Sequence, residues 1–238
     1  MYFRILLFST LLFFSLAIHT ANGEGMILWS IKELAKAPVE KIELRNKKDK
    51  VVGTVDVKQL VNIYAATVAI KEVAEIHAEL VLTPGDDPNA FATIGKILDG
   101  KLVGPESKDG EEINIMGLNF GILEMLGDDY DAAAAIIGHE LAHLKLNHYE
   151  DSKEAMQKNP DGRITAANTK YSRDNERDAD YLGVIWSIEA GYDPSGVVRA
   201  QESLYNLYKR KGGTFGSSHP SSIERITVLK SLVRRLSR

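Results

Sequence analysis

The sequence predicts an α+β fold, in which a small β-sheet packs against several helices. In its first half, short segments alternate apolar and polar residues, as half-buried strands do. Proline and glycine separate these segments, and helical periodicity prevails from residue 117 onward. At 238 residues, of which 44% are hydrophobic, the chain is long enough for a full core and for two domains at most.

Residues 1–23 are predicted to be a secretory signal peptide. Arg4 provides a positive start, and the apolar run over 5–18 is shorter than the roughly 20 residues that cross a membrane. Small residues follow at positions 21 and 23 and suit cleavage at the end of this segment. Cleavage after Ala17 and an uncleaved signal anchor are the alternatives. We therefore expect an exported protein, periplasmic or secreted, with no stable membrane span in the mature chain.

The composition excludes several function classes. The chain has no cysteine, which rules out a disulfide framework, a thiol nucleophile and a Cys-ligated zinc ribbon. Lys and Arg number 29 against 33 Asp and Glu, for a net charge of −4, and no long basic run occurs. Nucleic acid is therefore not expected as a partner, because its binding requires a concentrated positive face.

Residues 24–75 are expected to form an N-terminal segment with its own elements. Alternating apolar and polar residues predict its strands, and apolar residues at helical spacing predict its helices. The expected elements are a helix over 26–37, a hairpin over 39–44 and 51–57, and a helix over 58–76.

Residues 76–238 are expected to form the second and larger domain. Its short extended segments come first, and breaks at 191–194 and 212–220 then divide the helical region. The expected strands are 77–83, 90–94 and 112–116, and the expected helices are 117–126, 130–149, 165–190, 195–210 and 221–236.

The sequence His139-Glu140-Leu141-Ala142-His143 is the pattern that indicates a metal site. Histidines four residues apart lie on one helix face, so both imidazoles can reach one metal ion. Glu140 points about 100° away from His139, near enough to contact a water on that ion. Incidental histidines on a surface helix are the alternative. The apolar flanks argue against it, because they predict a buried helix whose polar side chains need partners.

A catalytic zinc usually has three protein ligands and an open position. His148 is one candidate for the third ligand, but on a continuing helix it lies 140° from His143, so we expect it at the surface or the helix end. Glu176 is the better candidate. Asp180, four residues later on the same helix, would accept a hydrogen bond from the free ring nitrogen of a ligating histidine. A solvated charged helix face is the alternative for this acidic run.

These motifs together resemble the HtpX and CAAX-prenyl-protease-type zinc metallopeptidases, in particular their soluble, exported bacterial members. The resemblance covers roughly residues 85–230 and rests on motifs in a characteristic order. They are Asn89–Ala92, Ala133–His143, Asn147-His148, Glu176–Asp180 with Gly183, Ala190–Pro194, Ser218–Pro220 and Arg225.

The resemblance implies a mostly helical gluzincin fold with a small sheet beside the active-site helix. It implies one zinc ion per chain, held by His139, His143 and Glu176, with Glu140 as general base. It also implies that His219 lies at the active site and that Arg225 holds the site acids. Taken alone, His219 before Pro220 is more typical of a loop at a helix start. The segment Asn89-Ala90-Phe91-Ala92 would be the edge strand that pairs with extended substrate.

The expected function is zinc-dependent endoproteolysis of unfolded or misassembled exported proteins. In this mechanism Glu140 takes a proton from the attacking water and passes it to the leaving amine. A zinc-retaining peptide-binding or chaperone-like protein with little turnover is the alternative, although a pure binder needs no base beside its metal. The polar segment 150–165 is a candidate lid over the site.

Overall fold

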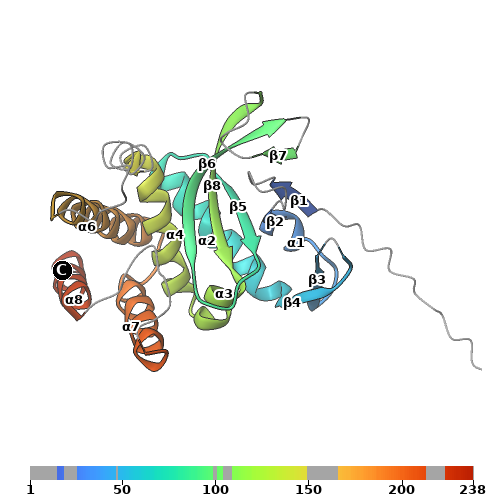
Figure 1. Ribbon diagram of the computed structural model, residues 1–238. Helices are drawn as coiled ribbons and strands as arrows, with labels where there is room; N and C mark the ends of the chain where they lie inside the picture. The colour runs from blue at the N-terminus through green and yellow to red at the C-terminus, as the bar shows by residue number, and fades with distance from the viewer. Residues whose placement is uncertain are drawn as a thin grey trace, which may run out of the picture.

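The computed structural model describes residues 15–18, 26–46, 48–98, 101–103, 109–148, 166–212 and 223–237. Figure 1 shows the layers: α4 runs beside a mixed β-sheet, and α6, α7 and α8 lie on the side of α4 away from the sheet. The expected α+β class, with a small sheet beside the helix of the His–Glu motif, is confirmed.

Six strands form the main sheet, in the order β1-β2-β5-β8-β6-β7. Their bounds are β1 Ser15–Ile18, β2 Met26–Ser30, β5 Glu79–Thr83, β6 Ala90–Leu98, β7 Lys101–Val103 and β8 Glu111–Asn119. The central pair β5–β8 is parallel and the other pairs are antiparallel. A separate hairpin joins β3 (Lys41–Arg45) to β4 (Val51–Asp56), as the alternating pattern predicts.

Three of the helices begin at side chains that cap them. Asp56, Asn119 and Asp129 precede α2, α3 and α4, and each accepts a hydrogen bond from a backbone N–H of the first turn. The helix bounds are α1 Ile31–Leu34, α2 Val57–Ala74, α3 Phe120–Leu126, α4 Tyr130–Lys145, α6 Ala166–Glu189, α7 Ser195–Arg210 and α8 Ile223–Leu236.

The expected helix over 26–37 is wrong for most of its length. Residues 26–30 form β2, and only Ile31–Leu34 are helical. Leu28 and Trp29 are both buried but belong to different apolar clusters, on opposite faces of the sheet. Successive side chains of a strand point to opposite faces of the sheet, so a strand paired with β5 buries both residues. A helix would bury side chains along only one of its faces. The helix predicted from 117 starts instead at Phe120, because residues 117–119 complete β8.

The main core lies between the sheet, α2 and α4, and it includes residues from the N-terminal segment as well as from the larger one. A second cluster joins α4 to α6, α7 and α8. Helix α4 is therefore covered on nearly every side, and its residues Ala132–Ala142 are all buried. No helix in the part of the chain that the structure describes has the length and apolar character of a membrane span.

Two glycines let α4 and α6 approach each other closely. A Cβ atom on Gly183 would lie 2.7 Å from the backbone nitrogen of His139, and one on Gly138 would lie 2.8 Å from the Gly183 carbonyl oxygen. Both distances are shorter than van der Waals contact, so a side chain at either position would force the two helices apart. This contact brings the residues of α6 within reach of the His–Glu motif on α4.

Candidate metal centre and cleft

Three side chains from two helices converge on one point. His139 and His143, one turn apart on α4, direct their Nε2 atoms toward each other at 3.1 Å. Glu176, from α6, places its carboxylate oxygens 3.5 Å from His139 Nε2 and 3.3 Å from His143 Nε2. These residues form a group whose ligand atoms all lie within 4.8 Å of one another.

The spacing of the ligand atoms on these three side chains fits a tetrahedral metal ion. Zinc bonds to nitrogen and oxygen are about 2.0–2.2 Å long, so two ligand atoms of a tetrahedral site lie about 3.3 Å apart. The two Nε2 atoms lie 3.1 Å apart, and each lies near a different carboxylate oxygen of Glu176, at 3.5 Å for His139 and 3.3 Å for His143, so the distances bracket this value. Two imidazoles and one carboxylate are also a donor set that zinc accepts in hydrolytic enzymes. The residues present therefore fit the ion.

Asp180 and Arg225 support His139 on its Nδ1 side, away from the convergence point. Asp180, one turn after Glu176, places Oδ1 3.0 Å from His139 Nδ1. Arg225 from α8 donates two hydrogen bonds to Asp180, at 2.8 and 2.7 Å, and its Nη1 lies 2.9 Å from Glu176. These contacts hold the His139 ring with Nε2 toward the convergence point.

The electrostatics of the site favour a cation. Burial alone would lower the pKa of His139, but hydrogen bonds to Asp180 and Glu176 raise it to about 9. Burial would raise the pKa of Asp180, yet the hydrogen bond to His139 and the charge of Arg225 keep it below the ordinary value. Glu140, Glu176 and Asp180 bring three carboxylates to this buried site, beside the guanidinium of Arg225. A divalent cation would compensate the excess negative charge.

His148 lies at the end of α4, one of the two places expected, but it is not at the surface, and the expectation that it faces away from His143 is wrong. Its side chain is buried, and its Nδ1 lies 2.9 Å from His143 Nδ1. The physical reason is the end of α4. The helix stops at Lys145 and Asn147 adopts a left-handed conformation with φ of 58°, so the angle of a continuing helix does not apply.

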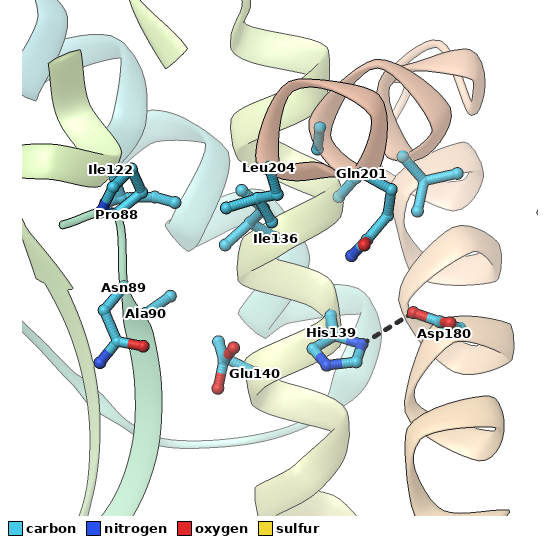
Figure 2. A pocket seen from close by; sticks show the side chains of 13 residues that line it. Pro88, Asn89, Ala90, Ile122, Ile136, His139, Glu140, Asp180, Gln201 and Leu204 are labelled. Carbon is cyan, nitrogen blue, oxygen red and sulfur yellow. Dashed lines mark ion pairs between the residues drawn. The ribbon is translucent and has the colours of Figure 1, made fainter. Parts of the chain in front are cut away.

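Glu140 faces a small cavity next to the metal ligands. The residue is 2% exposed, and Figure 2 shows its carboxylate between the first residues of β6 and the His139 ring. The cavity has a volume of about 40 Å³, enough for about three water molecules or the end of an aliphatic side chain. The motif residues His139 and Glu140 line it together with Pro88–Ala90, Ile122, Ala135, Ile136, Asp180, Val197, Ala200, Gln201 and Leu204.

The segment predicted to bind substrate runs along β6 beside this cavity. Asn89 and Ala90 line it, while Phe91 points to the other face of the sheet, where it packs near Val81 and Ile115. β8 pairs with β6 on one side over its length, but β7 pairs on the other side only over Lys96–Leu98. Among the described residues, the outer side of Ala90–Gly95 has no strand partner.

Some predicted features lie outside the described residues. They are His219, the candidate lid at 150–165 and most of the candidate signal peptide.

The cavity wall from α7 and α3 was not anticipated from the sequence. Val197, Ala200 and Leu204 recur at helical spacing and mark one apolar face of α7, which was the available signal. The spacing predicts that this face of α7 is buried, but not what it packs against. Its position beside Glu140 depends on how α7 packs on α4.

Comparisons with known proteins first give the class. The chain is similar to three metalloproteases. It is 28% identical to Metalloprotease YcaL of Escherichia coli over 48% of this chain and 52% of YcaL. It is 24% identical to Metalloprotease LoiP of Escherichia coli over 44% of this chain and 50% of LoiP. It is 30% identical to the mitochondrial metalloendopeptidase OMA1 of Arabidopsis thaliana over 46% of this chain and 26% of OMA1. The matches span about half of each bacterial relative and about a quarter of the plant one.

The family follows from a match over most of the chain. The profile of peptidase family M48 matches residues 54–160 and 155–233. The chain therefore belongs to peptidase family M48, and the family resemblance drawn from its motifs is confirmed. The metallopeptidases of this family depend on zinc, which agrees with the two-histidine, one-glutamate group.

Proposed function

We propose that the protein is a zinc endopeptidase that hydrolyses peptide bonds in unfolded or misassembled exported proteins. The observation that carries this proposal is the position of Glu140. This buried carboxylate adjoins both the proposed ligand His139 and the cavity where a substrate would lie. A protein that only retained zinc or bound peptide would have no need of a base at this point.

In this proposal His139, His143 and Glu176 hold one zinc ion per chain. When bound, the zinc ion lowers the pKa of a water molecule and polarises the scissile carbonyl group. Glu140 accepts the proton of the attacking water at its carboxylate and then donates it to the leaving amine nitrogen. Asp180 keeps the proton of His139 on Nδ1, and Arg225 holds Asp180 and Glu176 in place. His219 would stabilise negative charge on the substrate carbonyl oxygen.

The substrate would bind as an extended strand on the outer side of β6. No strand of the described residues pairs with that side of Ala90–Ala92, and β-strand addition recognises main chain regardless of sequence. This mode suits unfolded polypeptides, because folded proteins seldom present a free extended segment. Ala90, which lines the cavity, would bring the neighbouring substrate side chain to its mouth.

Casein hydrolysis by the purified protein tests the proposal. The arms are wild type, wild type with a chelator followed by added zinc, and the variants Glu140→Gln and Glu72→Gln. Glu72 is exposed on α2 and is the matched control. We expect chelation to abolish turnover, zinc to restore it, and only Glu140→Gln to lack it. Bound zinc without turnover in wild type would favour the peptide-binding alternative, and absence of bound zinc would refute the metal centre.

Export is a separate part of the proposal. The predicted signal peptide supports it, and cleavage after residue 23 would remove the edge strand β1 and leave a mature chain that begins at Glu24. Mass spectrometry of the protein from the exported fraction of its host would give this N-terminus, whereas an intact Met1 in the membrane fraction would indicate the signal anchor instead.

A further inference from the structure

The two candidate histidine ligands are supported by different groups. His139 directs Nδ1 at a carboxylate oxygen of Asp180, 3.0 Å away, whereas His143 directs Nδ1 at the Nδ1 of His148, 2.9 Å away. The rings of His143 and His148 meet edge to face, with centroids 5.0 Å apart and an interplanar angle of 70°. His148 is 7% exposed, so this contact is shielded from bulk water.

The end of α4 creates this contact. The backbone N–H of Leu146 still bonds to the Ala142 carbonyl oxygen, and Asn147 then turns the chain with a positive φ. Asparagine tolerates this left-handed conformation better than most residues. The turn returns His148 to the helix face that carries His143, a position that continued helix would not allow.

We propose that His148 is a positioning residue that accepts a hydrogen bond from Nδ1–H of His143 and so holds its Nε2 toward the metal. The proposal rests on the metal centre of the proposed function. A neutral imidazole carries one N–H, and an Nε2 that binds a cation leaves the proton on Nδ1. Two Nδ1 atoms at 2.9 Å share a single proton, so His148 must accept at Nδ1 and carry its own proton on Nε2.

The geometry separates this role from metal ligation by His148. Its Nδ1 faces the nitrogen of His143 that points away from Glu176, and the metal-binding group contains only His139, His143 and Glu176 among the described residues. A neutral imidazole accepts a weaker hydrogen bond than the Asp180 carboxylate does. We therefore expect His148 to contribute less to metal affinity than Asp180.

Zinc affinity of the full chain, measured by competition with a chromophoric chelator, tests the role without substrate. Removal of such a supporting group weakens metal binding by about 10- to 100-fold, and His148→Phe should fall near the lower end, at about 10-fold. His148→Asn can keep an acceptor oxygen near the same position and should stay within about threefold of wild type. His77→Phe, which removes an exposed histidine, is the control and should leave affinity unchanged.

Nitrogen-15 NMR of the zinc-loaded wild type gives a second readout that requires no variant. We expect a protonated Nδ1 on His143 and an unprotonated Nδ1 on His148. Wild-type affinity in His148→Phe, or a proton on Nδ1 of His148, would overturn the inference. A protein that binds zinc as expected but cleaves no casein would refute the proposed proteolysis and leave the role of His148 standing.

Discussion

Replacement of Gly183 by alanine should weaken zinc binding more than it weakens the fold. The new Cβ atom would lie 2.7 Å from the backbone nitrogen of His139 and 3.0 Å from the carbonyl carbon of Gly138. Non-bonded atoms need about 3.5 Å, so α6 must retreat from α4 by about 0.8 Å at this point. Glu176 lies on the same helix, and its carboxylate would move away from the Nε2 atoms of His139 and His143.

The two effects differ in size. Overpacking costs about 1–3 kcal/mol, and the better helix propensity of alanine offsets about 1 kcal/mol of it. The free energy of unfolding of the metal-free protein should therefore fall by about 0–2 kcal/mol. Metal ligands tolerate displacements of only about 0.2 Å, so zinc affinity should fall by about 100-fold or more. Chelator competition measures the affinity, and urea unfolding of the metal-free protein measures the stability.

Gly127→Ala provides the control for general destabilisation. Gly127 lies between α3 and α4 with φ of 52°, and no atom of the described part of the chain lies within 4 Å of an added Cβ atom. Alanine there costs about 1–3 kcal/mol in backbone strain without pressing on α6. This control should retain wild-type zinc affinity. A folded Gly183→Ala protein that binds zinc within threefold of wild type would refute the idea that helix approach sets the ligand geometry.

Three further predictions concern the ion pair of Asp129 with Arg199, the cavity beside Glu140, and the buried acids that Arg225 contacts. A hydrogen bond from Arg199 lowers the pKa of Asp129, so this stability is present above about pH 4 and lost as the pH falls through the folded-state value. Asp129→Asn should cost up to about 1 kcal/mol in urea unfolding at pH 7 and less at pH 3; an equal cost at both pH values would contradict this. Leu204→Phe should fill most of the cavity and shift casein cleavage, mapped by mass spectrometry, toward smaller side chains at the adjacent substrate position; an unchanged cleavage profile would exclude the cavity as a subsite. Arg225→Leu leaves Asp180 and Glu176 buried without their guanidinium, so metal-free protein should lose about 3–5 kcal/mol, and a loss below 1 kcal/mol would count against the network.

Local patterns in the sequence determined much of the architecture. The hairpin over β3 and β4 and the long helices follow from residue periodicity, because alternation and helical spacing depend on neighbours along the chain. The pairing of His139 with His143 on one face is likewise a property of a single helix. Glu176 and Asp180 could be anticipated because they share the same four-residue spacing on the next long helix, and the structure brings both to His139.

Tertiary structure decided the features that depend on packing between elements. Residues 26–30 became a strand because β5 offers a partner and two sheet faces bury Leu28 and Trp29, whereas isolated sequence allowed an amphipathic helix. His148 contacts His143 because the chain turns at Asn147. Helical periodicity in the sequence does not predict the residue at which a helix ends. The cavity beside Glu140 is formed by β6, α3, α4, α6 and α7, which are distant in sequence. Its shape depends on the approach of backbones and side chains across these elements, information that the periodicity of any one element does not contain.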